Sequence, residues 1–240
     1  MARDIRTLLI VDNRAASLFY WGMLLKRLEY KVVGKRNAAD ALKVLETDPP
    51  AVVLMEVTLS GSDGVALLRE IKSDLRFKDI PVIILTSVTD PAVKDACERL
   101  GCAAWLGKDV EPDALYQKLQ VLVESTPRQH IRLSTSVKVI VGDGTTMGGS
   151  ARTEYASAIS EGGLYVRTQY PQPQNALTPV RIMLDGGEVQ AKAVVLYSYA
   201  KNEGPHKEPG MGLKFVNISD QDRRLIRQFI KDHLTRGIAH

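Results

Sequence analysis

The chain has 240 residues, a formal net charge of +4, 45% hydrophobic residues and 25% charged residues. This length is enough for two domains with hydrophobic cores, and the composition is typical of a globular protein rather than a disordered one. The apolar runs, such as Val52 to Met55, are too short to cross a bilayer, so we expect no membrane insertion. Cys97 and Cys102 have no histidine nearby, which argues against a disulfide framework or a metal site and fits a cytoplasmic protein.

The charge is divided unevenly between the two halves. Residues 1–124 contain 17 basic and 18 acidic residues, a net charge of −1, whereas residues 125–240 contain 15 basic and 10 acidic residues, a net charge of +5. A basic second half suits an anionic ligand. No run of Lys and Arg forms a stripe, so we expect no nucleic-acid partner.

Residues 1–124 alternate between strand patterns and helix patterns. Uninterrupted apolar strands are typical of a parallel sheet that is covered on both faces. We expect strands at 7–11, 30–34, 51–55, 81–85 and 103–106. We expect helices near 18–28, 38–46, 63–72, 90–100 and 112–123. Five such units predict an α/β doubly wound parallel sheet.

The pattern changes after a polar segment that contains Pro127, and we place the linker there. Short runs rich in β-branched residues follow at 134–141, 154–159, 164–168, 179–184, 189–199 and 212–216. Six short strands separated by Gly and Pro turns predict a closed antiparallel β-barrel, because closure removes exposed strand edges. Ser219 is a good N-cap for a C-terminal helix.

Polar residues follow the strands of the first half at regular places. Asp12 and Asn13 end the first strand, Glu56 follows the third, Thr86 ends the fourth and Lys108 follows the fifth. Over residues 5–124 this spacing resembles the receiver domain of bacterial response regulators. The resemblance implies a flavodoxin-like strand order. It also implies an acidic pair for Mg²⁺, an aspartate that accepts a phosphoryl group, and a Thr and a Lys that contact the phosphate.

Three positions depart from that family's pattern. Asn13 stands where the second acid of the pair belongs, Glu56 stands at the acceptor position, and Asp109 follows Lys108 where the family usually has proline. Losing a carboxylate weakens a Mg²⁺ site, because this ion prefers hard oxygen ligands in octahedral geometry. Glutamate is one methylene longer than aspartate, so its oxygens cannot take the acceptor's place for in-line transfer. We therefore predict that residues 1–124 are a degenerate pseudo-receiver.

Two interpretations of Glu56 remain open. In the first, the longer carboxylate imitates a phosphorylated acid, pairs with Lys108 and accepts a hydrogen bond from Thr86. In the second, Glu56 is a drifted residue in a domain that is kept for dimerisation or docking.

Two arginines four residues apart, Arg128 and Arg132, open the second half, and Ala158-Ile-Ser160-Glu-Gly-Gly163 follows about thirty residues later. This order resembles the ligand-binding motif of PilZ domains, R-x-x-x-R followed by [D/N]-x-S-x-x-G. The resemblance implies that residues 125–240 form a β-barrel that binds cyclic di-GMP through Arg128, Arg132, Ser160 and Gly163. Arginine suits this ligand because its planar fork binds phosphates and the O6/N7 edge of guanine. Ala158 stands where the family has Asp or Asn, and it offers no side-chain hydrogen bond.

We find no motif of a nucleotide-hydrolysing loop, a metalloprotease or a nucleophile elbow, so we expect no enzymatic activity and no required cofactor. The sequence predicts a signalling adaptor in which the PilZ domain is coupled to protein partners. By resemblance, these partners belong to a motility, polarity or secretion system. The alternative is a protein–protein interaction module with two degenerate domains and no nucleotide ligand.

Overall fold

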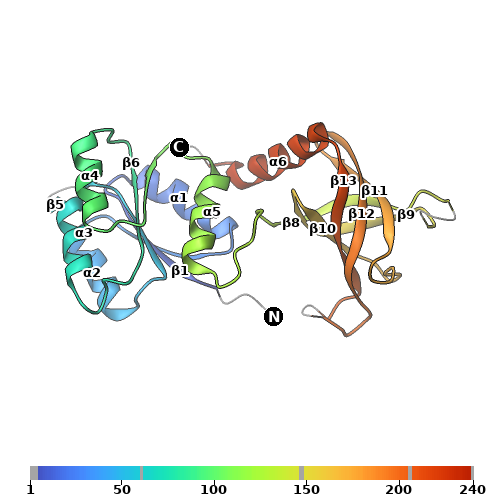
Figure 1. The fold of residues 1–240 in the computed structure, drawn as a ribbon, viewed down its shortest axis with the longest axis horizontal. Helices are drawn as coiled ribbons and strands as arrows, with labels where there is room; N and C mark the ends of the chain where they lie inside the picture. Colours follow the sequence, from blue (N-terminus) through green and yellow to red (C-terminus); the bar gives the residue numbers. More distant parts are fainter. Residues whose placement is uncertain (1–4, 60–61, 146–148, 205–206, 239–240) are drawn as a thin grey trace. The chain divides into compact units, whose positions relative to one another are not determined.

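The computed structural model describes residues 5–59, 62–145, 149–204 and 207–238, and the chain divides into two compact units (Figure 1). Of the described residues, one unit contains 5–129 and 234–238. The other contains the described residues of His130–His233. The division after Gln129 lies later than the predicted end of the first domain at residue 124. One side-chain contact accounts for this, because Gln120 Oε1 accepts a hydrogen bond from the backbone N–H of Arg128 at 2.9 Å.

The first unit is built on a parallel sheet of five strands in the order β2-β1-β3-β6-β7. The strands are β1 (Thr7–Val11), β2 (Lys31–Lys35), β3 (Val52–Met55), β6 (Val82–Thr86) and β7 (Ala104–Gly107). This order confirms the predicted doubly wound, flavodoxin-like sheet. The sequence did not predict the two-residue strands β4 (Thr58–Leu59) and β5 (Ser62–Asp63), which pair with each other just after β3.

Helices cover both faces of this sheet (Figure 1). They are α1 (Ala15–Arg27), α2 (Ala38–Thr47), α3 (Gly64–Ser73), α4 (Pro91–Arg99) and α5 (Pro112–Val123). Strand residues alternate between the faces, so both faces must be apolar. Leu9, Val53 and Ile84 pack under α2, α3 and α4, and α1 and α5 cover the other face with Trp21 and Leu115.

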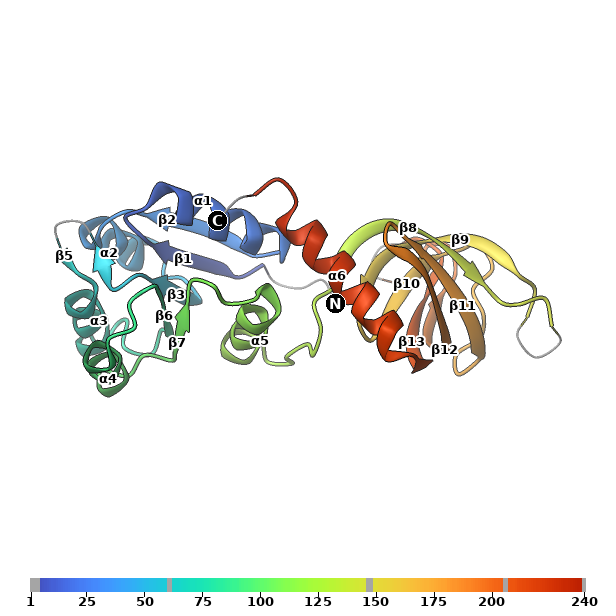
Figure 2. The same ribbon diagram turned by 90° about the horizontal axis from the view of Figure 1, so that it is seen from above.

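The second unit is a closed antiparallel barrel in the order β10-β13-β12-β11-β8-β9 (Figure 2). The strands are β8 (Leu133–Val141), β9 (Arg152–Ser160), β10 (Gly163–Arg167), β11 (Leu177–Leu184), β12 (Gly187–Tyr199) and β13 (Gly210–Ile218). Helix α6 (Asp220–Thr235) follows, and Ser219 Oγ accepts from the backbone N–H of Asp222 at 3.0 Å. The predicted barrel, terminal helix and cap are all present.

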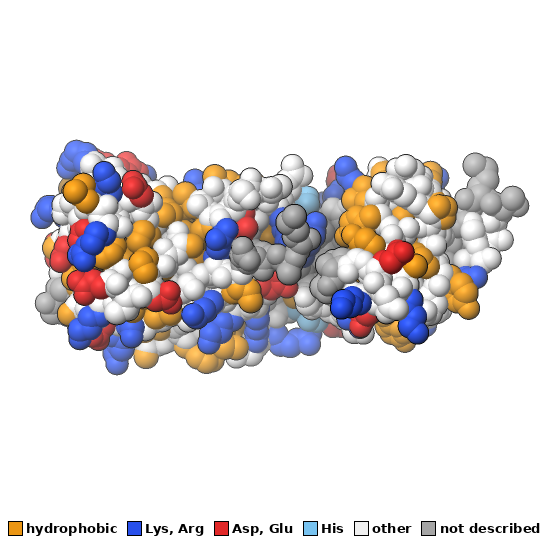
Figure 3. All heavy atoms as spheres, turned by 90° about the horizontal axis from the view of Figure 1, so that it is seen from below, with side chains coloured by type: hydrophobic (Ala, Val, Ile, Leu, Met, Phe, Trp, Pro, Cys, Tyr) orange, Lys and Arg blue, Asp and Glu red, His pale blue; other side chains and the backbone are white. Residues whose placement is uncertain are grey.

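Alternate residues of each barrel strand point inward and form the core. These inward residues are apolar along most of the barrel and include Val137, Val139, Ala156, Val166, Val180, Ile182, Ala193, Val195 and Leu213. Acidic and basic side chains are interspersed on the surface of the first unit (Figure 3). None of the helices in the described part of the chain is long and apolar enough to cross a membrane.

Candidate functional sites

The first candidate site lies where the strands of the parallel sheet end. Asp12 follows β1, Glu56 follows β3, Thr86 is the last residue of β6 and Lys108 follows β7. The carboxyl ends of parallel strands meet at one edge of a sheet, so residues far apart in the sequence converge there. All four side chains are buried, with Lys108 only 5% exposed.

Lys108 joins the two acids of this site. Its Nζ lies 2.6 Å from Asp12 Oδ2 and 2.6 Å from Glu56 Oε2. The Glu56 carboxylate also accepts, through Oε1, from the Thr86 hydroxyl and from the backbone N–H of Val57 at 2.8 Å. Charges buried in this way are tolerated because each has a charged or hydrogen-bonding partner. The Glu56 carboxylate therefore holds the lysine and the threonine together as the first interpretation of Glu56 expects.

Asn13, the remaining residue of the predicted pocket, directly follows Asp12 and is half-buried. Its backbone carbonyl accepts from Arg36 Nη2 at 3.0 Å. Asp12 Oδ1 accepts from the backbone N–H of Arg14 at 2.8 Å. In the described residues we find no group of three or more Asp, Glu, His or Cys side chains that could hold a metal ion.

The second candidate site lies at one end of the barrel. In the β8–β9 ladder Leu133 pairs with Ile159 and Ser134 pairs with Ala158, so the register puts Arg132 across from Ser160. Leu133 and Ile159 are buried in the core, which leaves Arg132, Ala158 and Ser160 on the outer face.

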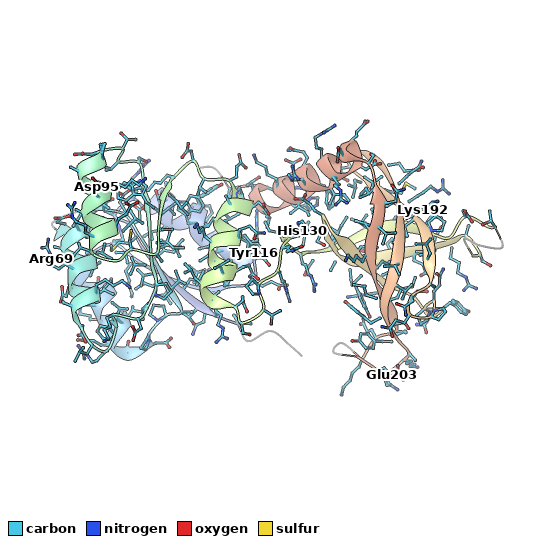
Figure 4. All side chains as sticks on the ribbon, viewed as in Figure 1. Arg69, Asp95, Tyr116, His130, Lys192 and Glu203 are labelled. Atoms are coloured by element: carbon cyan, nitrogen blue, oxygen red, sulfur yellow. The ribbon has the colours of Figure 1, made fainter. Side chains whose placement is uncertain are left out.

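The turn that follows Ser160 is tightly held. Ser160 pairs with Gly163 in the β9–β10 hairpin, and its hydroxyl donates to the Gly163 carbonyl at 3.1 Å. A side chain at Gly163 would collide with the backbone of β13, because an added Cβ would lie 2.0 Å from the Leu213 carbonyl oxygen. His130, labelled in Figure 4, packs against Gly162. Gly163 therefore has a packing role in addition to the predicted ligand contact.

The structure adds two arginines of α6 that the sequence analysis missed. Arg227 makes a bidentate contact with Glu161 of the turn, with Nε donating to Oε1 at 3.0 Å and Nη2 donating to Oε2 at 2.7 Å. Arg223 Nη1 donates to the Glu161 carbonyl at 3.2 Å. The hydrogen bonds from Arg227 are the main reason why the pKa of Glu161 is lowered, with smaller contributions from His130 and Arg223. The turn between Ser160 and Gly163 thus lies among several cationic groups.

Of the four predicted ligand residues, Arg132, Ser160 and Gly163 come together at this end of the barrel. Arg128 belongs to the other unit, where its backbone is bound to Gln120. No local pattern in the sequence pointed to Arg223 and Arg227, because they reach the turn from more than sixty residues away in the chain.

Comparison with known proteins also divides the chain into two domains, but the boundary falls between residues 120 and 123 rather than after Gln129, so Arg128 lies within the PilZ match. Residues 8–120 match the family model of the response regulator receiver domain, and residues 123–232 match that of the PilZ domain. Response regulator Rre1 of Synechocystis is 30% identical over 115 residues, which cover 48% of this chain and 50% of that protein. Protein PilH of Pseudomonas aeruginosa is 26% identical over 116 residues, which cover 48% of this chain and 96% of that protein.

Solved structures also match the first half. A putative response regulator from Chloroflexus aurantiacus has 26% sequence identity and a TM-score of 0.48, and the match covers 50% of this chain and 98% of that one. The chain spans only half the length of Rre1, so the similarity concerns the domain and not the whole relative. The chain is therefore a signalling protein that combines a response regulator receiver domain with a PilZ domain.

Proposed function

We propose that this protein is a non-enzymatic signalling adaptor whose PilZ domain senses cyclic di-GMP and whose receiver domain binds partner proteins without being phosphorylated. The observation that supports ligand binding most directly is the shared outer face of Arg132 and Ser160 beside the Gly163 turn. A cyclic dinucleotide has two phosphates and two guanines, and it requires a guanidinium, a hydroxyl and a stretch of backbone that the ligand can approach closely.

The receiver domain supports the second part of the proposal. Glu56 already forms the ion pair with Lys108 and the hydrogen bond from Thr86 that the family's phosphorylated acid would use. The proposal assigns Glu56 the role of a permanent substitute for the phosphorylated aspartate. The signal then enters through the barrel, and the receiver domain offers a fixed surface to proteins of a motility, polarity or secretion system.

Ala158 favours the alternative of an interaction module without a nucleotide. It pairs with Ser134 and Tyr165 on the outer face, and its methyl group gives the ligand no hydrogen bond. An unmatched polar group on a bound ligand costs on the order of 1–3 kcal/mol, which is tenfold or more in affinity.

Isothermal titration of the full chain with cyclic di-GMP separates the two functions. The proposal predicts saturable heat with the wild type and with Arg181→Ala, a control that removes an exposed arginine of β11. It predicts at least tenfold weaker binding for Arg132→Ala. The absence of saturable heat in the wild type at millimolar ligand would favour the interaction module.

A further inference from the structure

A cavity of about 490 Å³ opens at the end of the barrel that is opposite the Ser160–Gly163 turn. It lies where β8 ends at Val141, where β9 and β11 begin, and beside Met211 at the start of β13. Its size falls within the range of small-molecule sites, roughly 300–1,000 Å³. Helix α6 contacts the turn at the other end of the barrel, so this cavity is distinct from the proposed cyclic di-GMP site.

The inward-facing residues change from apolar to polar at this end. Ala156 of β9 faces the core and is fully buried, so strand alternation puts Glu154 and Arg152 on the same face, where Glu154 is half-buried and Arg152, at the mouth of the barrel, is exposed. Thr168 and Thr178 are also buried here, at 5% and 0% exposure. Buried polar groups are costly unless they have partners, and the buried Thr168 has one in Glu154.

The two charges of the cavity are held apart from each other. Arg152 lies over the ring of Tyr170, with its guanidinium carbon 4.1 Å from the ring centre. Glu154 Oε1 accepts from the hydroxyl of Thr168 at 2.6 Å. Within the described residues, Arg152 and Glu154 form no salt bridge with each other, although both line the cavity. The second carboxylate oxygen and the guanidinium N–H groups are therefore available to a ligand.

The rest of the wall mixes polar side chains, among them Ser150 and Gln172, with apolar ones. The apolar part includes the buried Met211 and the exposed Leu177. A purely anionic ligand would face the carboxylate of Glu154, and a purely cationic one would face the guanidinium of Arg152. A molecule with both charges and an apolar group satisfies all three features at once.

We propose that this cavity binds a small zwitterion, a free α-amino acid with an apolar side chain. Its carboxylate binds Arg152, its ammonium group binds Glu154, and its side chain packs against Met211 and Leu177. The PilZ domain would then receive a second, metabolic signal at the opposite end from the cyclic dinucleotide.

The chemistry of the ligand provides the first test. Isothermal titration of the full chain is carried out with L-leucine, L-methionine and L-phenylalanine. It is repeated with 4-methylpentanoate, which lacks the ammonium group of leucine, and with 3-methylbutylamine, which lacks the carboxylate. The proposal predicts saturable heat for at least one of the three amino acids. It also predicts that each leucine analogue binds at least tenfold more weakly than leucine, or shows no detectable binding. No saturable heat with any of the three amino acids at millimolar concentration, or an analogue that binds as well as leucine, would overturn it.

Variants of the protein provide the second test. Glu154→Gln and Arg152→Gln are each expected to weaken amino-acid binding at least tenfold. The controls Glu188→Gln and Arg181→Gln remove like charges from exposed positions on β12 and β11 and are expected to bind as the wild type does. Melting temperatures show that each variant is folded. Unchanged amino-acid binding in Glu154→Gln would contradict the assignment. Arg132→Ala, at the other end of the barrel, is expected to bind the amino acid as the wild type does, so this test does not depend on whether cyclic di-GMP binds.

Discussion

The ammonium group of Lys108 lies 2.6 Å from Glu56, and the same carboxylate accepts the Thr86 hydroxyl. This relationship makes Glu56 part of a buried polar network at the carboxyl edge of the sheet. Because Lys108 also binds Asp12, one lysine neutralises part of the charge of two acids.

Removing the lysine is expected to destabilise the receiver domain strongly. Lys108→Met leaves Asp12 and Glu56 buried without their cation, and breaking a buried ion pair in this way typically costs about 3–5 kcal/mol. Urea denaturation of the variant measures the loss. Lys118→Met, at an exposed position of α5, is the matched control and should change stability by less than about 0.5 kcal/mol.

The wild-type protein is expected not to accept a phosphoryl group. Glu56 is already bound to Lys108 and Thr86, and its oxygens are displaced by one methylene from the acceptor position. Incubation with acetyl phosphate and Mg²⁺, followed by intact-mass measurement, should show no increase in mass. A stoichiometric adduct on residues 1–124 would show that the pocket is a working receiver.

Shortening Glu56 tests its role as a permanent substitute for the phosphorylated acid. Glu56→Asp withdraws the carboxylate from Lys108 and Thr86, so the signalling output in cells should change at normal protein level. Leu54→Asp puts a charge into a fully buried strand position and should abolish function whatever Glu56 does. If Glu56→Asp is silent while Leu54→Asp is not, the domain is only a scaffold for docking.

The barrel is expected to lose stability in acid, because the ion pair between Glu161 and Arg227 that stabilises it at neutral pH is lost there. The pKa of Glu161 is lowered in the folded protein, chiefly by the hydrogen bonds from Arg227, so the stabilisation is fully present above the ordinary pKa of 4.5. It is lost as the pH falls through the lower value of the folded state. Melting curves of Glu161→Gln should lie below those of the wild type at neutral pH and approach them in acid. A difference that does not depend on pH would show that the charge of Glu161 contributes nothing.

Much of the receiver pocket could be predicted from the sequence. Asp12, Glu56, Thr86 and Lys108 each follow or end an apolar strand, and the geometry of a parallel sheet then brings them to one edge. The pairing of Glu56 with Lys108 and Thr86 was one of two interpretations that the sequence left open, because a strand pattern gives the position of a side chain and not the direction in which it turns.

The barrel contains the features that the sequence did not reveal. Arg227 contacts Glu161 across a long stretch of chain, and such pairs have no periodic pattern that would identify them. Arg152 and Glu154 lie at the start of a strand, where charged residues usually face solvent. Closure of the barrel puts them at the mouth of a cavity, where Glu154 is half-buried and Arg152 is exposed.

The most direct test of the account compares two substitutions with opposite expected effects on cyclic di-GMP binding. Arg132→Ala should weaken binding at least tenfold, because a charge-assisted hydrogen bond contributes roughly 1.5–3 kcal/mol. Ala158→Asn should tighten binding, because the amide supplies the group that the PilZ motif has and this chain lacks. Isothermal titration of the wild type and these variants should therefore show the affinity order Ala158→Asn, wild type, Arg132→Ala. No binding by the wild type and no rescue by Ala158→Asn would contradict cyclic di-GMP sensing by this protein.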